Sequence, residues 1–77
     1  MSVEDRVQSV VAEFTHHNVE AKESLFDSGL LDSFTLPDML TALEKEFAIA
    51  VPDSDLDPRK FDTVERICAY VRSRLPA

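Results

Sequence analysis

A chain of 77 residues, 44% of them hydrophobic, has room for one small domain around one core, which excludes a multi-domain enzyme. We therefore expect a single domain over residues 1–77. The formal net charge of −7 argues against DNA or RNA as a partner, because phosphate binding needs positive charge. Thirteen of the fifteen acidic side chains lie in residues 1–58. A partner that docks by charge is thus expected to be basic, although the same acids also keep a small domain soluble.

The cysteine content indicates the cellular compartment, and the length of the apolar runs indicates whether a segment could cross a membrane. Cys68 is the only cysteine, so no intramolecular disulfide can form, and we expect a reducing compartment, the cytoplasm. The longest apolar runs are five residues, 47–51 and 67–71, and the N-terminus has no basic stretch ahead of an apolar one. We therefore expect no signal peptide, no membrane association and a monomer. Cys68 is interpreted as a small buried hydrophobe rather than a nucleophile.

The first element is a predicted helix over residues 2–15. Ser2 is a suitable N-cap, and acidic Glu4 and Asp5 follow in the first turn, where the helix dipole favours them. Apolar side chains recur at helical spacing through this segment: Val3, Val7, Val10, Val11 and Phe14.

Residues 18–32 show neither a helical nor an alternating period, which predicts a long loop between the first two helices. Long connections in compact domains tend to be functional. The loop holds four large apolar side chains that we expect to pin it onto the core: Leu25, Phe26, Leu30 and Leu31. Gly29, the only glycine, is expected to supply a turn just before the next helix.

A second helix is predicted from Ser33, as N-cap, to about Phe47. Its expected buried stripe is Leu36, Leu40, Leu43 and Phe47, with Met39 beside it. Pro37 then falls at the fourth helical position, where little hydrogen bonding is lost. The free N–H groups and the dipole at such a helix end suit a phosphate carried on the serine oxygen. Phe34 lies off the stripe, which leaves open whether it faces a partner or folds onto the core.

The remainder of the chain predicts a short third helix and a final one. Pro52 and Pro58 limit residues 57–61 to a short turn of helix, with Leu56 and Phe61 expected to point inward. The last helix is predicted to open at residue 62 or 63 and to end near Arg74. The predicted fold is all-α, a four-helix bundle with a short third helix and a long loop between helices one and two.

The residues allow two kinds of site to be assessed, a catalytic serine and a calcium-binding loop. Ser33 has no GxSxG motif around it, so a serine nucleophile is not expected. The segment from 53 to 65 opens like a calcium-binding EF-hand loop, but its sixth position is Pro58 and its twelfth is Val64, where glycine and glutamate are needed. We expect no metal site, while weak surface cation binding by Asp53, Asp55 and Asp57 stays open.

The chain resembles the acyl and peptidyl carrier proteins. The resemblance rests on "SLFDSGLLDSF", an apolar helix ending "ALEKEF", the "VPD" element and a last helix opening "FDTVERI", and it runs from the first helix to about Arg74. Its most specific part is the triplet Asp32, Ser33, Phe34 after Gly29 and Leu31.

The resemblance implies a carrier and not an enzyme. Ser33 is expected to bear a 4′-phosphopantetheine arm through a phosphodiester, and the arm's thiol to hold an acyl or aminoacyl group as a thioester. The implied partners are a phosphopantetheinyl transferase that supplies Mg²⁺, a ligase that activates the acyl or aminoacyl group, and a downstream acyltransferase or synthase of fatty acid or secondary metabolite biosynthesis. By position, the docking surface includes Asp32, Phe34, Asp38, Met39 and Glu44.

Two departures indicate which carriers are most similar. Thr35 stands where fatty-acid carriers usually have an acid, and Lys45 interrupts the acids of the second helix. "GLLDSF" and "KFDTVERI" look more like stand-alone D-alanyl and related amino-acyl or acyl carriers that work with a separate adenylating ligase. A second hypothesis is a small acidic helical protein that binds partners without modification and uses Phe34 and Met39 as an apolar anchor.

Overall fold

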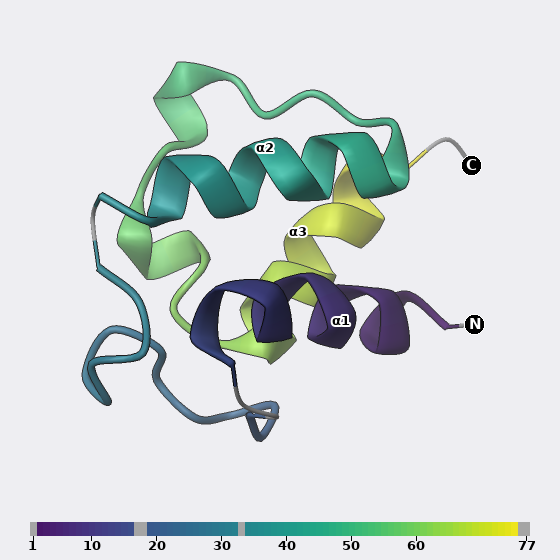
Figure 1. Ribbon diagram of the computed structural model, residues 1–77. Helices are drawn as coiled ribbons and strands as arrows, with labels where there is room; N and C mark the ends of the chain where they lie inside the picture. The colour runs from purple at the N-terminus through teal and green to yellow at the C-terminus, as the bar shows by residue number, and fades with distance from the viewer. Residues whose placement is uncertain (1, 17–18, 33, 76–77) are drawn as a thin grey trace.

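The computed structural model describes residues 2–16, 19–32 and 34–75 (Figure 1). Its regular elements are three α-helices and two short 3₁₀ turns: α1 (Val3–Thr15), α2 (Leu36–Phe47), η1 (Asp53–Asp55), η2 (Pro58–Lys60) and α3 (Val64–Arg74). The described residues contain no strand, so the all-α prediction is confirmed. Across these same ranges, no helix is both long enough and apolar enough to cross a bilayer.

Helices α1 and α3 begin where capping side chains place them. Ser2 accepts a hydrogen bond from the Asp5 N–H at 3.1 Å, and Thr63 accepts one from the Arg66 N–H at 3.1 Å. Each hydroxyl satisfies one backbone donor that the first helical turn leaves unpaired. The helices predicted over 2–15 and from 62 or 63 to Arg74 are confirmed within a residue or two.

Helix α2 begins at Leu36, three residues later than predicted. A turn precedes it, in which Asp32 Oδ1 accepts from the N–H groups of Phe34 (3.0 Å) and Thr35 (2.8 Å). The predicted start at Ser33 was wrong because this carboxylate organises the backbone ahead of the regular helix. Pro37 is consequently the second helical residue, a position at which a missing N–H costs no intrahelical bond. Ser33, which was predicted to cap this helix, lies outside the described residues, so its capping role stays a prediction.

The expected short third helix is replaced by the two 3₁₀ turns, so the predicted four-helix count is not confirmed. Pro58 opens η2, and Asp57 accepts from the Arg59 N–H at 2.9 Å, which confines the turn to three residues. Phe61 is fully buried as expected. Leu56 is 45% exposed, so the prediction that it points inward was wrong.

The core lies between the three helices, and the loop before α2 contributes to it (Figure 1). Buried side chains come from the three helices, from the loop before α2 and from the residue after η2: Val7, Val10, Val11, Val19, Leu25, Leu31, Leu36, Met39, Leu40, Leu43, Phe47, Phe61, Val64, Ile67, Cys68 and Val71. Cys68 is buried among them, as interpreted from the sequence. Segments that carry the proposed site are therefore attached directly to the core.

Candidate functional site

Residues 19–32 form a loop that is fastened to the helices on both sides. The Leu25 N–H donates to the Asp62 carbonyl at 2.6 Å, and the Glu65 N–H donates to the Ala21 carbonyl at 2.9 Å. Both bonds join the loop to the start of α3. On the other side, Gln8 of α1 donates its Nε2 to the Val19 carbonyl at 2.6 Å.

The end of this loop makes a turn at Gly29. Gly29 has φ +80, a left-handed conformation that side chains disfavour, and its N–H donates to the Phe26 carbonyl at 3.1 Å. The chain then returns, because the Leu31 N–H donates to the Leu25 carbonyl at 3.0 Å. Leu25 and Leu31 are buried, while Phe26 and Leu30 pack against the core. The predicted pinning and turn are confirmed, so the chain reaches Asp32 along a fixed path.

Ser33 lies outside the described residues, but both of its neighbours are described and exposed. Hydrogen bonds from the backbone N–H of Thr35, then of Phe34, hold the pKa of Asp32 below its usual value, so the carboxylate stays ionised. These bonds also occupy two N–H groups that were expected to be free for a phosphate. An arm attached at position 33 would lie between two exposed residues, Asp32 and Phe34.

Some of the residues expected to dock a partner are exposed, while others are buried or hydrogen-bonded within this chain. Phe34 is 87% exposed and Asp38 is exposed, so the alternative in which Phe34 folds onto the core does not hold. Met39 is fully buried, and its expected part in a docking surface was wrong because it faces the core beside Leu40 and Leu43. Glu44 is half-buried, and its Oε2 accepts from the Val51 N–H at 3.0 Å.

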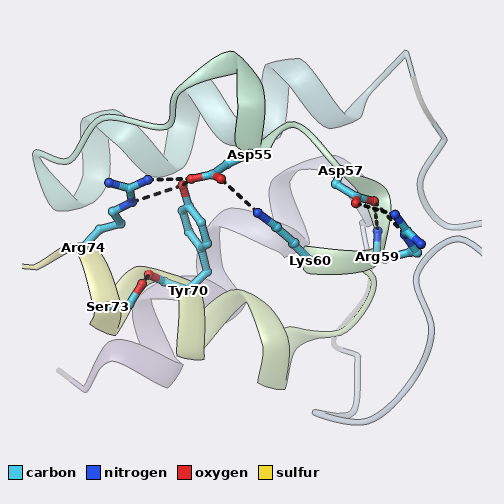
Figure 2. Close-up of polar contacts among 7 residues, drawn as sticks. All are labelled: Asp55, Asp57, Arg59, Lys60, Tyr70, Ser73 and Arg74. Carbon is cyan, nitrogen blue, oxygen red and sulfur yellow. Dashed lines mark hydrogen bonds and ion pairs between the residues drawn. The ribbon is translucent and has the colours of Figure 1, made fainter.

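Two of the three aspartates of the segment 53–57, Asp55 and Asp57, form ion pairs within this chain. Asp55 accepts from the Tyr70 hydroxyl at 2.7 Å, Lys60 Nζ at 2.9 Å and Arg74 Nη2 at 2.5 Å (Figure 2). Asp57 pairs with Arg59 at 3.0 Å. Within the described ranges, no group of three or more His, Cys, Asp or Glu side chains could hold a metal ion. The weak cation binding left open for these aspartates is therefore not supported.

We call Asp55, Lys60, Tyr70 and Arg74 the Asp55 cluster. The Tyr70 hydroxyl, with Lys60 and Arg74, holds the pKa of Asp55 far below its usual value. The cluster attaches the segment that follows α2 to helix α3. It was not predicted from the sequence. The only signal was that Tyr70 and Arg74 are four residues apart, which places them on one face of a helix.

Comparison with known proteins agrees with this geometry. Residues 5–71 match the family described as "Phosphopantetheine attachment site". The chain is 32% identical to the D-alanyl carrier protein of Abiotrophia defectiva over 97% of this chain and 99% of that one. It is 33% identical to the D-alanyl carrier protein of Bacillus pumilus over 87% and 90%, and 41% identical to that of Lactobacillus acidophilus over 66% and 65%.

Asp32 and Phe34, the described neighbours of position 33, are both exposed, which is compatible with the covalent group that this family attaches. The match covers all of α2 and most of α1 and α3. The chain therefore belongs to the phosphopantetheine attachment family and is a non-catalytic carrier whose covalently attached 4′-phosphopantetheine holds its cargo as a thioester.

Proposed function

We propose that the arm is attached to Ser33 and that it carries D-alanine or a closely related small amino acid between a ligase and an acyltransferase. The observation that supports this most directly is the exposed Asp32 and Phe34 at the end of a loop fastened to α1 and α3. A modifying enzyme can reach a hydroxyl between these two residues without opening the core. When attached, the arm supplies the thiol that forms the thioester.

The role proposed for the residues of this chain is to hold the arm where partner enzymes can reach it. The loop bonds to α1 and α3 hold the path of the chain as far as Asp32. Phe34 offers an exposed apolar contact, and Asp38, in the first turn of α2, offers an exposed negative charge. The acids of residues 1–58 favour partner enzymes with basic surfaces. The segment that contains η1 and η2 takes the place of the short third helix of a four-helix carrier bundle.

Three features favour an aminoacyl cargo over a fatty acyl cargo. Several relatives are named D-alanyl carrier proteins. Thr35 and Lys45 replace the continuous acidity expected on the second helix of a fatty-acid carrier. Fatty-acid enzymes that recognise such a helix by charge are therefore expected to bind this one less tightly.

Attachment is tested by mass spectrometry after incubation with coenzyme A, Mg²⁺ and a broad-specificity phosphopantetheinyl transferase. We expect a gain of one phosphopantetheine, abolished in Ser33→Ala. Ser28→Ala is the matched control, because Ser28 is an exposed serine of the same loop, and it is expected to be modified like the natural sequence. An unmodified chain, under conditions that modify a known carrier, would favour the hypothesis of an unmodified interaction module.

Cargo is tested on the modified protein with a D-alanine-activating ligase, ATP and D-alanine. We expect a hydroxylamine-sensitive mass gain of one alanyl group, and a much slower reaction with a fatty-acyl ligase. Faster loading with a fatty acid than with D-alanine would overturn the assignment of the cargo but leave the attachment at Ser33 standing.

A further inference from the structure

Helices α1 and α3 pack against each other, and a cavity of about 240 Å³ opens between them beside the loop 19–32 (Figure 1). Val64 and Cys68 are each 2% exposed and form its floor. Glu4, Glu65 and Arg72 are exposed and stand at its mouth. None of its lining residues belongs to α2, so the cavity is separate from the helix that follows the attachment point.

Gln8 of α1 brings an unpaired hydrogen-bond acceptor to this cavity, which its side chain lines. The Gln8 Nε2 donates to the Val19 carbonyl at 2.6 Å, and because a carbonyl only accepts, this bond fixes which end of the carboxamide is the nitrogen. The Oε1 atom is buried and has no hydrogen-bond partner among the described residues. Buried acceptors in folded proteins are nearly always paired. A ligand that donates a hydrogen bond inside the cavity would satisfy this one.

The charged groups at the mouth favour a cation. Glu4 and Glu65 carry two negative charges and Arg72 carries one positive charge, so the lining has a net charge of −1. Arg72 is bound to Glu4, whereas the Glu65 carboxylate has no ion-pair partner within the described ranges. A group that is positively charged and donates N–H bonds therefore suits both Glu65 and Gln8.

The walls of the cavity are held by bonds that also fasten the loop 19–32. The Glu65 N–H donates to the Ala21 carbonyl at 2.9 Å, and Gln8 is held by its bond to Val19. A preformed cavity of this kind loses little entropy on binding. Its volume lies below the range of roughly 300–1,000 Å³ that is typical of sites for drug-sized ligands, so the occupant is small.

We propose that this cavity binds a small primary ammonium compound. The ammonium group donates to Gln8 Oε1 and pairs with the Glu65 carboxylate, while a short apolar body packs on Val64 and Cys68. The aminoacyl group of the proposed function carries such an ammonium, so the occupant is either that group at the end of the arm or a free amine of similar size. Only the first of these sources rests on the proposed function.

Binding is tested by NMR titration of the unmodified, isotope-labelled natural sequence with three small probes. Propylammonium has the charge and the N–H donors, tetramethylammonium has the charge without the donors, and propanol has no charge. Gln8 is the only glutamine of the chain, so its side-chain amide signal reports directly on the cavity. We expect propylammonium to move this signal with a dissociation constant on the order of 1 mM, and to bind about tenfold more tightly than the other two probes.

Two variants and their matched controls locate the site. Glu65→Gln removes the unpaired charge, and Glu13→Gln makes the same change at an exposed position of α1 outside the cavity. Ala21→Leu places a larger side chain at an exposed lining position, and Ala69→Leu makes the same change at an exposed position of α3 outside the cavity. Circular dichroism melts confirm that each variant is folded.

We expect Glu65→Gln to weaken propylammonium binding about threefold at low salt, as the loss of a partly exposed ion pair does, and less at high salt because of screening. Ala21→Leu should abolish the binding by filling the entrance. Both controls should bind propylammonium as tightly as the natural sequence.

The alanyl-loaded protein identifies the source of the ammonium. A Gln8 signal that shifts on loading, together with propylammonium binding that is about tenfold weaker than before, assigns the cavity to the cargo. An unchanged signal and an unchanged affinity assign it to a free amine.

Equal affinities for propylammonium and either of the other probes would overturn this inference, because the N–H donors or the charge would then not be recognised. Unchanged propylammonium binding in Ala21→Leu would also overturn it, since the ligand would lie elsewhere. Failure of the natural sequence to gain phosphopantetheine or alanine is a different result, because it rejects the proposed function while the titration of the unmodified chain stands.

Discussion

The two long connections of this protein are held by different forces. The loop 19–32, ahead of α2, is joined to α3 by backbone hydrogen bonds, and two leucines anchor it in the core. The connection 48–63, after α2, has a buried anchor in Phe61, and in addition Asp55 joins it to Tyr70 and Arg74 of α3 through its ionised carboxylate. Only the second kind of attachment depends strongly on pH and salt.

This difference in attachment is consistent with the different roles of the two connections. The first leads to the residue proposed to bear the arm, and backbone bonds with buried leucines keep that path the same under all conditions in which the protein is folded. The second is held in part by ion pairs whose partly exposed charges compete with water and salt. Each connection can therefore be disrupted separately, and the disruptions should differ in size and in their dependence on solution conditions.

Leu25→Ala should have the largest effect, because it removes the fully buried anchor of the first connection. The lost burial and the resulting cavity are expected to cost about 2–5 kcal/mol of unfolding free energy. Urea denaturation followed by circular dichroism measures this. Leu30→Ala is the matched control at a half-buried leucine of the same loop, and a loss no larger than that of the control would contradict the role given to Leu25.

Gly29→Ala should have a smaller effect on the same connection. A Cβ at Gly29 meets nothing within 4 Å, so the cost comes from the backbone alone. At φ +80 an L-residue is expected to lose about 1 kcal/mol of stability. The same urea experiment measures the change, with Ser28→Ala as the neighbouring control. A stability equal to that of the natural sequence would mean that the turn is not fixed by this residue.

Asp55→Asn should lower the melting temperature in a way that depends on pH. The folded pKa of Asp55 lies below its usual value of 3.8, so its stabilising contribution is complete above that value. The contribution is lost as the pH falls below about 4 toward the folded pKa. The difference in melting temperature between the natural sequence and Asp55→Asn should therefore be constant near neutral pH and shrink below pH 4.

Asp57→Asn is the control for this experiment, because Asp57 pairs with Arg59 two residues away and does not reach α3. Its melting temperature should change less than that of Asp55→Asn at neutral pH. A gap between Asp55→Asn and the natural sequence that persists unchanged well below pH 4 would show that the ionised carboxylate is not what joins the connection to α3.

Salt should have the smallest effect. With a net charge of −7, the chain repels itself, and screening is expected to raise the melting temperature slightly between low and physiological ionic strength. Thermal melts over that range measure the change. A flat or falling melting temperature would mean that the attractions of the Asp55 cluster outweigh the repulsion among the remaining acids.

Local sequence rules predicted the parts of the fold that depend on neighbouring residues. The apolar spacing located α1 and α3, Ser2 capped as expected, and Gly29 made the turn assigned to it. The exposure of Phe34 was one of two alternatives that its place off the predicted stripe left open, and the structure decides it. Each of these features is decided within one or two helical turns of the residue concerned.

Three other features were not predicted, and only the last of them is decided by residues far along the chain. The start of α2 depends on a turn held by Asp32, and Met39 faces the core because the buried face of α2 is wider than one stripe. Leu56 stays exposed because Asp55 is held by Tyr70 and Arg74, fifteen and nineteen residues further along the chain. The spacing of residues along the sequence gives no indication that Asp55 pairs with Tyr70 and Arg74.

The burial of Cys68 has a consequence for how the cargo is kept. Thioesters are lost to competing thiols, and a nearby cysteine could accept the acyl group by exchange. Cys68 is 2% exposed, and burial raises the pKa of its thiol, so little nucleophilic thiolate is available. The protein itself therefore offers no sulfur for acyl migration, and a thiol reagent added to the folded, modified protein counts only unloaded arms.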